Sequence, residues 1–234
     1  MAQLQRLVIA PSQLKNQQLT LTSAQLHYLT RVLRLRSGDR FIALDGQGHC
    51  WVAELKPALV PAQILEAIPA QTELPRLVGL MAAPPKGNGF DQVVHCATEL
   101  GVSWIMPVLS DRTLISPSPQ KLERWRRIAQ EAAEQSERQI VPQVLEPLSF
   151  GESLQQCYQV DCDKEAARYL CVTRQPAPSL LRCLQTSSPS AIVIATGPEG
   201  GWTASEVEQA IEGGYQPVSL GCRILRTVTA PLTA

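Results

Sequence analysis

The residues best suited to bind a ligand lie between positions 191 and 210. An apolar run, 191–196, leads into the glycine-rich run 197–201 (Gly-Pro-Glu-Gly-Gly), and a helical pattern starts at about Ala204. Ligands of α/β sheets bind beyond the carboxyl ends of strands, where glycines let the main chain approach them closely. A tight strand-to-helix turn that needs glycine only for its dihedral angles explains the same residues. The spacing fits neither GxGxxG nor GxxxxGK[ST], so it predicts no dinucleotide or P-loop site.

A second glycine-bearing loop follows the next apolar run. This run, 217–221, ends in Leu220-Gly221, and Ile-Leu-Arg-Thr follows at 224–227. Apolar side chains beside free backbone amides suit an adenine ring and a thioether better than a phosphate. Taken alone, Arg226 is best explained as a surface charge. Two such loops after consecutive strands nevertheless predict one shared pocket.

The elements that must position these loops alternate between strand-like and helix-like patterns. The strand candidates are 77–83, 104–109, 167–173, 191–196 and 217–221. Helical spacing is expected over 90–101, over 121–138 and after Thr203, which forms a capping box with Glu206. The same helical spacing predicts that the side chains of Leu100 and Ile211 face the core. This alternation predicts an α/β fold with a mostly parallel sheet that is covered on both faces.

The first part of the chain has the pattern of a small β-rich domain. We expect a strand over 4–10, a helix over 23–34 capped by Ser23, and a β-hairpin formed by 40–45 and 49–55. The Pro-rich stretch around 57–75 ends this region. The expected domains are therefore 1–70 and 74–234.

Composition narrows the class of protein. Of the 234 residues 44% are hydrophobic and 18% charged, which is typical of a soluble globular protein. No apolar run approaches the roughly 20 residues of a membrane span, and the first residues do not resemble a secretory signal. Seven scattered cysteines form no CxxC pair, and the histidines do not cluster with them at metal-ligand spacing. We therefore expect reduced cysteines, no bound metal and a cytoplasmic location.

The net charge is zero, but it is unevenly distributed. Residues 1–57 hold seven Lys and Arg against three Asp and Glu. Arg31, Arg34 and Arg36 stand close together there, and guanidinium groups suit phosphate contacts. They are candidate RNA-binding residues, although the charged edge of a small barrel explains them too. Arg138 is a further RNA-binding candidate, and an ordinary solvated helix face explains it equally well.

Five segments in register resemble a known family. They are HYLTRVLRLRSGD (27–39), ATELGVSWIMPVLSDRT (97–113), ERWRRIAQEAAEQSER (123–138), TGPEGGWTASE (196–206) and LGCRILRTVTA (220–230). Together they resemble the bacterial 16S ribosomal RNA uridine-N3-methyltransferases of the SPOUT superfamily. The resemblance implies an N-terminal PUA-like β-barrel domain that holds RNA and a C-terminal trefoil-knotted α/β methyltransferase domain that forms a homodimer. The implied partner is 16S ribosomal RNA or the small ribosomal subunit.

The same resemblance implies a binding site for S-adenosylmethionine. Its residues are expected to be Thr196, Gly197, Glu199, Gly200, Leu220, Gly221, Ile224, Leu225 and Thr227. The family usually has Glu at the position of Val228, and its chains usually continue beyond position 234 with a packed helix.

Methyl transfer to uridine N3 requires in-line orientation of the reactants and loss of the N3 proton. Glu199 is the nearest carboxylate, although a carboxylate stabilised by a helix N-terminus is an alternative explanation for it. Arg226 could stabilise negative charge on a uracil oxygen. A non-catalytic RNA-binding or ribosome-assembly protein is the main alternative function, favoured by Val228. A dinucleotide-dependent oxidoreductase is disfavoured because the Rossmann fingerprint is missing.

Overall fold

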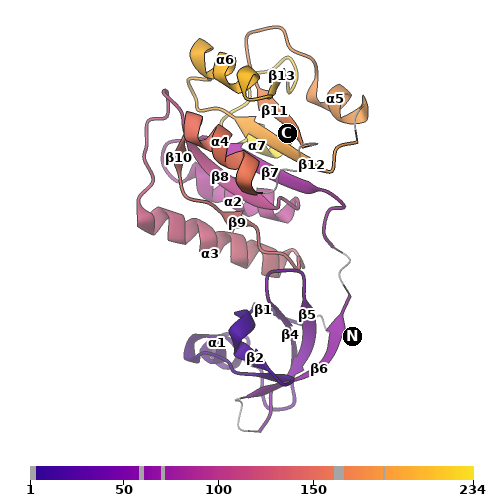
Figure 1. Cartoon of the computed structure of the whole chain (residues 1–234). Helices are drawn as coiled ribbons and strands as arrows, with labels where there is room; N and C mark the ends of the chain where they lie inside the picture. The colour runs from indigo at the N-terminus through magenta and orange to yellow at the C-terminus, as the bar shows by residue number, and fades with distance from the viewer. Residues whose placement is uncertain (1–3, 58–60, 70–71, 161–165, 187) are drawn as a thin grey trace. The chain divides into compact units, whose positions relative to one another are not determined.

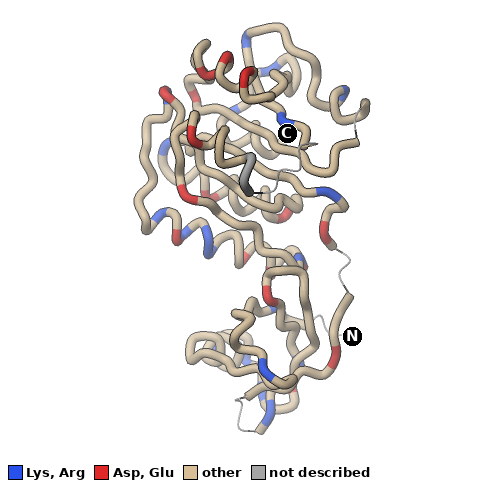
Figure 2. Tube along the Cα trace, viewed as in Figure 1, with Lys and Arg blue, Asp and Glu red and all other residues tan. Residues whose placement is uncertain are grey.

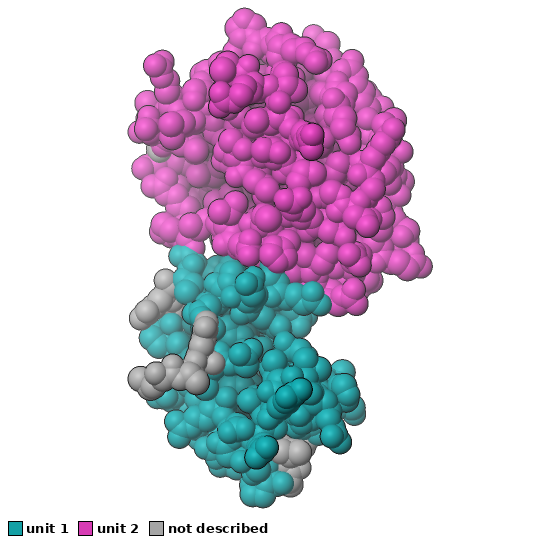
Figure 3. Space-filling view, turned by 180° about the vertical axis from the view of Figure 1, so that it is seen from behind, with its two compact units in different colours: residues 1–73, 130–141 teal, residues 74–129, 142–234 magenta. Residues whose placement is uncertain are grey.

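The chain divides into two compact units (Figure 3). A computed structural model describes residues 4–57, 61–69, 72–160, 166–186 and 188–234, without the side chains of 158–160. The first unit comprises residues 1–73 and 130–141, and the second comprises 74–129 and 142–234. The sequence had assigned 130–141 to the second domain. Its contacts group it with the first compact unit, in which the Glu73 carboxylate accepts hydrogen bonds from the amides of Gln139 and Ile140.

The first unit is built on a sheet of six strands in the order β1-β4-β5-β6-β3-β2 (Figure 1). Its strands are β1 (Arg6–Val8), β2 (Leu14–Lys15), β3 (Gln18–Leu19), β4 (Arg40–Leu44), β5 (Cys50–Glu54) and β6 (Ala62–Ile68). Strands β4 and β5 form the expected antiparallel hairpin, and β1 pairs with β4 in parallel. Phe41 and Ala43 alternate along β4 into a core shared with Leu29.

The helix of the first unit is shorter than its apolar spacing predicted. A 3₁₀ turn, η1 (Pro11–Gln13), precedes it; α1 (Ser23–His27) then continues as a π-helical turn, η2 (Tyr28–Val32). Thr22, not Ser23, is the N-cap, and its hydroxyl accepts a hydrogen bond from the amide of Gln25. The helix ends before Arg34, which has a left-handed φ of 59°. Because glycine is the usual residue in that conformation, the sequence carried no stop signal here.

The second unit contains the predicted parallel sheet, with strand order β10-β8-β7-β12-β11-β13 and β9 paired to β8. Its strands are β7 (Leu77–Ala82), β8 (Trp104–Leu109), β9 (Gln143–Val144), β10 (Leu148–Ser149), β11 (Ala167–Cys171), β12 (Ala191–Thr196) and β13 (Gln216–Val218). Its helices are α2 (Gly89–Glu99), α3 (Pro119–Gln135), α4 (Phe150–Val160), α5 (Leu180–Thr186), α6 (Ala204–Glu212) and α7 (Ala230–Thr233), of which α3 runs on into the first unit.

Helices cover both faces of this sheet. Successive residues of a strand point to opposite faces, and in these strands both sets of side chains are largely apolar and must be buried. Along β11, Leu170 belongs to a core that includes Leu154 of α4 and Ala210 of α6. The preceding residue, Tyr169, packs on the opposite face with Leu180 of α5. The position of the sheet between these helices can be followed in Figure 1.

Two apolar residues that the helical spacing directed into the core are exposed. Leu100 is 61% exposed because it follows the last residue of α2, where the chain turns through Gly101 at a φ of 99°. Ile211 is 51% exposed, since the buried stripe of α6 runs through Glu206 and Ala210 instead. The capping box of Thr203 and Glu206 is present as predicted.

The C-terminal segment returns from the edge of the sheet to its interior. Strand β13 is an edge strand, but α7 contacts both α2 and the central strand β12. A trefoil knot, as the family resemblance implies, requires the C-terminal segment to return to the sheet interior in this way. None of the helices within the described residues combines the length and the apolar character needed to cross a membrane.

Candidate active site

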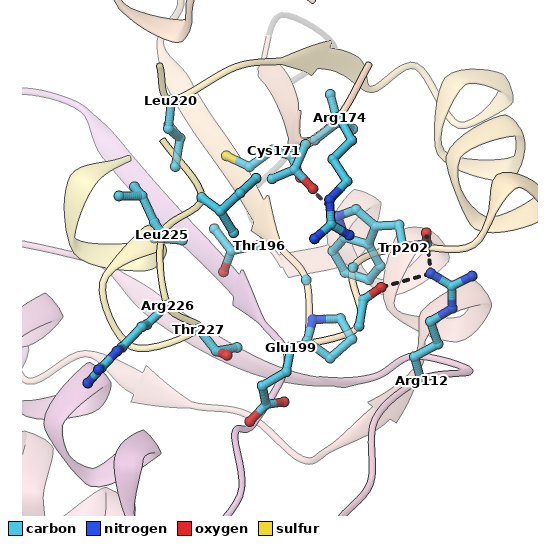
Figure 4. Close-up of a pocket in the computed structure, with 18 of the residues that line it drawn as sticks. Arg112, Cys171, Arg174, Thr196, Glu199, Trp202, Leu220, Leu225, Arg226 and Thr227 are labelled. Atoms are coloured by element: carbon cyan, nitrogen blue, oxygen red, sulfur yellow. Dashed lines mark hydrogen bonds between the residues drawn. The ribbon is translucent and has the colours of Figure 1, made fainter. Parts of the chain in front are cut away.

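A pocket of about 1040 Å³ lies at the carboxyl edge of the parallel sheet of the second unit. The segments that follow β7, β8, β11, β12 and β13 all contribute to its wall. This is the edge at which open α/β sheets bind ligands. Both glycine-bearing loops line the same pocket, and Figure 4 shows side chains from both loops around it.

All residues expected to hold the methyl donor line this pocket. They are Thr196, Gly197, Glu199, Gly200, Leu220, Gly221, Ile224, Leu225 and Thr227. The residues expected to act in catalysis, Glu199 and Arg226, line it as well. The geometry therefore brings together segments that are separated by about 20 residues in the sequence.

Thr196 provides an unsatisfied polar atom in the pocket wall. Its side chain is only 1% exposed, and its Oγ1 has no hydrogen-bond partner among the described residues. Figure 4 places it in the middle of the pocket, beside Leu225 and below Leu220. A buried hydroxyl without a partner is destabilising, so the arrangement favours a polar ligand atom at this position.

The loop after β12 is held in place from several sides. The Glu199 carboxylate accepts a hydrogen bond from the amide of Lys86 at 3.1 Å. The Trp202 indole donates to the Cys171 carbonyl at 3.1 Å and packs on Phe150 with ring centroids 4.7 Å apart. The Arg112 guanidinium donates to the Gly200 carbonyl at 2.7 Å. These contacts give the loop a defined path along the pocket.

Glu199 does not stabilise the N-terminus of the following helix. Helix α6 begins at Ala204, and its capping residues are Thr203 and Glu206. Glu199 is exposed and holds the segment after β7 through Lys86. In Figure 4 its carboxylate points away from Thr196. Glu199 thus makes no capping contact with α6.

Arg226 lies at the rim of the pocket. Its side chain is exposed, and no carboxylate of the described residues pairs with its guanidinium. Its carbonyl accepts hydrogen bonds from the amides of Thr229 and Ala230, which start α7. The backbone of Arg226 is thus fixed while its charged group stays available to a ligand.

Val228 packs beside the start of α2. A Cβ atom added to Gly89 would lie 2.8 Å from Cγ2 of Val228, so the two residues are in close contact. Asn88, the N-cap of α2, makes no side-chain capping hydrogen bond. A glutamate at position 228, as the family usually has, would bring a carboxylate to this uncapped helix end.

Several pocket residues were missed by the sequence analysis, among them Arg112, Cys171, Arg174 and Trp202. The strand-end rule could have found the first three, because they end or follow β8 and β11. Burial raises the pKa of the Cys171 thiol to about 12, so Cys171 stays protonated and is no nucleophile.

One group of possible metal ligands was also missed. Ligand atoms of His95, Cys96 and Glu99 on α2 lie within 4.8 Å of one another. Nδ1 of His95 is 3.6 Å from the Glu99 carboxylate, and burial together with Glu99 raises the pKa of the Cys96 thiol. A raised pKa disfavours the thiolate that binds metals, and none of the three residues lines the pocket. Cys162, one of the seven cysteines expected to be reduced, lies outside the described residues.

The RNA-binding candidates of the first unit have different environments. Arg31, Arg34 and Arg36 are exposed, and the described part of the chain offers their guanidinium groups no carboxylate partner. Arg138 is only 3% exposed, and its Nη2 lies 2.6 Å from the Glu73 carboxylate. Burial opposes ionisation of Glu73, but Arg138 and two backbone amides outweigh it and lower the pKa of Glu73.

The RNA-binding prediction for Arg138 is therefore wrong. A buried guanidinium that is already paired with a carboxylate cannot reach a phosphate group without breaking that pair. Instead, Arg138 stabilises the first unit by joining residues 65 positions apart in the chain.

Comparison with known proteins agrees with this architecture. A family model described as an RNA methyltransferase domain matches residues 72–234, and one described as an RNA methyltransferase PUA domain matches residues 21–58. The ribosomal RNA small subunit methyltransferase E of Synechocystis sp. is 52% identical over 98% of this chain and 75% of its own length. The Bacillus subtilis protein of the same name is 34% identical over 92% of this chain and 87% of its own length.

Solved structures show the same similarity. The crystal structure of a ribosomal RNA small subunit methyltransferase E from Neisseria gonorrhoeae, bound to S-adenosyl methionine, superposes with a TM-score of 0.85. It is 32% identical, and the match covers 98% of this chain and 94% of that chain. The strand-end pocket thus belongs to a fold already known with a bound methyl donor. The chain belongs to the RNA methyltransferase family that includes the ribosomal RNA small subunit methyltransferases E.

Proposed function

We propose that this protein is an S-adenosylmethionine-dependent methyltransferase that methylates N3 of a uridine in 16S ribosomal RNA of the small subunit. The observation that carries the proposal is the pocket formed by two glycine loops around the unpartnered hydroxyl of Thr196. The family of the chain and the N. gonorrhoeae structure with bound S-adenosyl methionine support it.

The pocket wall has the chemistry that S-adenosylmethionine requires. Leu220, Ile224 and Leu225 provide apolar surface for an adenine ring, and the Thr196 hydroxyl can bond a polar atom of the nucleoside. When bound, S-adenosylmethionine supplies a methyl group that its sulfonium already activates. The protein therefore has to orient the reactants and manage one proton.

The side chains at the rim would handle the charge changes. N3 of the uridine loses its proton and bonds to the methyl carbon while the carbon–sulfur bond breaks. In our proposal the Glu199 carboxylate assists removal of the N3 proton. Its Oε1 accepts the Lys86 amide, and its other oxygen has no hydrogen-bond partner among the described residues. The Arg226 guanidinium stabilises the negative charge that develops on a uracil oxygen.

The cofactor assignment can be tested at Thr196. Replacing Thr196 by valine keeps the shape of the side chain but removes the unpartnered hydroxyl. We expect the free energy of unfolding without ligand to rise by about 1 kcal/mol and the Kd for S-adenosylmethionine to rise by about three- to tenfold. Thermal unfolding and titration calorimetry measure the two effects.

Thr98→Val is the matched control. Thr98 is fully buried in the same unit, and its hydroxyl already donates to the Val94 carbonyl at 2.7 Å. This variant should gain no stability and should bind S-adenosylmethionine like the wild type. Equal cofactor affinity in Thr196→Val and wild-type protein would contradict the role of the Thr196 hydroxyl.

We also propose that the first unit contacts phosphate groups of the RNA through Arg31, Arg34 and Arg36. Figure 2 marks the basic residues of the chain, and these three are exposed. The triple alanine variant should keep cofactor affinity while each lost contact reduces the slope of log affinity against log salt by about 0.7–0.9. Filter binding of 16S ribosomal RNA across a salt series measures the slope.

Arg40→Ala serves as the control for this experiment. Arg40 is exposed in the same unit, but its Nε lies 3.8 Å from the Glu54 carboxylate. Its loss should change the slope by less than one contact does. If the triple variant shows the wild-type slope, the RNA surface lies elsewhere. A homodimer, which the family resemblance implies, completes the proposal, and sedimentation velocity tests it.

A non-catalytic RNA-binding protein of the same fold is the alternative that Val228 favoured. Val228 packs beside Gly89 at the start of α2 and also lines the pocket, so the structure is compatible with either function. Transfer of a labelled methyl group from S-adenosylmethionine to small-subunit RNA separates the two functions. Cofactor binding without any methyl transfer would support the non-catalytic alternative.

A further inference from the structure

The turn after β8 carries an arginine to which the proposed reaction gives no role. Nη1 of Arg112 donates to the Gly200 carbonyl at 2.7 Å and to the Trp202 carbonyl at 3.4 Å. Both carbonyls belong to the glycine loop after β12, 88 and 90 residues farther along the chain. Figure 4 shows the guanidinium reaching these two oxygens from the outer side of the loop.

The methylene stem of Arg112 also determines how closely the loop approaches. A Cβ atom added to Gly200 would lie 3.0 Å from Cδ and 3.2 Å from Cβ of Arg112. The φ of Gly200 is not positive, so its dihedral angles do not demand glycine. The absence of a side chain at position 200 is explained by the close packing of Arg112.

The turn that carries Arg112 is hydrogen-bonded to Glu206, which lies just after the glycine loop. The Glu206 carboxylate, 4% exposed, accepts hydrogen bonds from the amide of Asp111 at 3.0 Å and from the amide of Thr203 at 2.7 Å. Within the turn, the Ser110 amide donates to the Thr113 hydroxyl at 2.9 Å. One buried carboxylate thus joins the turn that bears Arg112 to the residue that ends the loop.

We infer that Arg112 is a positioning residue for methyl transfer, which holds the Gly200 segment in the path that opens the pocket to the methyl donor. This inference rests on the proposed function, because it assigns the loop to S-adenosylmethionine. Arg112 acts through the Gly200 and Trp202 carbonyls and touches neither reactant. The alternative is direct contact of its exposed guanidinium with an RNA phosphate, which the experiment distinguishes.

The test compares Arg112→Ala, Arg112→Lys, Gly200→Ala and the double variant Arg112→Ala/Gly200→Ala. Arg112→Ala should raise the Kd for S-adenosylmethionine by about five- to twentyfold, since a charge-assisted hydrogen bond to the loop is lost. The KM for RNA should stay at the wild-type value. Arg112→Lys should recover part of the affinity, because an ammonium can still donate to one carbonyl.

The double variant tests whether Arg112 acts through Gly200. In the wild type, Gly200→Ala should weaken cofactor binding by about fivefold, because the added methyl group would lie 3.0 Å from Cδ of Arg112 and the two segments would have to move apart slightly. In the Arg112→Ala protein the approach to Cδ is removed and only the 3.2 Å approach to Cβ remains, so Gly200→Ala should raise the Kd by less than about twofold. Additive effects of the two substitutions would overturn the inference.

Arg182→Ala is the matched control, because Arg182 is an exposed arginine on α5 of the same unit and does not line the pocket. It should leave cofactor affinity and melting temperature unchanged. An Arg112→Ala protein with wild-type cofactor affinity, or with a raised KM for RNA alone, would overturn the positioning role. Failure of the wild type to bind S-adenosylmethionine would instead contradict the proposed function, so the two failures are distinguishable.

Discussion

Replacing Arg226 by alanine should lower kcat for RNA methylation by about 10²–10³-fold. The guanidinium has no carboxylate partner among the described residues and stands at the rim of the pocket, so its removal leaves developing negative charge on the uracil uncompensated. The Kd for S-adenosylmethionine should change little, because the Arg226 carbonyl, which accepts hydrogen bonds from the amides of Thr229 and Ala230, is kept. Single-turnover methyl transfer and calorimetry measure the two quantities.

Arg226→Lys keeps the charge but loses the planar donor pair, so it should recover part of the lost rate. Arg182→Ala again provides an exposed arginine outside the pocket and should show the wild-type rate. Turnover of RNA by Arg226→Ala at the wild-type rate would show that this arginine is structural. The proposed stabilisation of charge on the uracil would then be wrong.

Replacing Gly221 by valine should weaken binding of S-adenosylmethionine by about tenfold to hundredfold. Gly221 has a φ of 118°, which side-chain-bearing residues rarely adopt, and no neighbouring atom lies within 4 Å of an added Cβ. The substitution therefore acts through the backbone alone. Its amide and carbonyl both bond the Ser219 hydroxyl, so a changed backbone would move the adjacent Leu220. Calorimetry measures the loss.

Gly38→Val is the matched control for backbone strain. Gly38 has a φ of 88° in the first unit, and an added Cβ would again meet no atom within 4 Å. This variant should lose stability to a similar extent but should bind the cofactor with wild-type affinity. If Gly221→Val binds as tightly as Gly38→Val, the loop after β13 does not form the cofactor site.

Local patterns were sufficient for most elements of the second unit. The strands 104–109 and 191–196 were predicted with the bounds that β8 and β12 have in the structure, because short apolar runs are typical of buried parallel strands. The capping box of Thr203 and Glu206 was also predictable, since its two partners are three residues apart. The ends of helices were less predictable: η2 stops at Val32, before an arginine in a left-handed conformation.

Sequence patterns were sufficient to predict the parallel sheet, the glycine loops and the edge at which they meet, because each depends on residues that are neighbours in the chain. The partners of the charged side chains, in contrast, became visible in the folded structure. Arg138 pairs with Glu73 across 65 residues, Arg112 bonds Gly200 across 88, and Glu199 accepts from Lys86 across 113. No local spacing encodes such pairs, since they form only when folding brings distant loops together. For the same reason the sequence placed Arg138 at an RNA surface and overlooked Arg112, although both residues stood in segments that it had singled out.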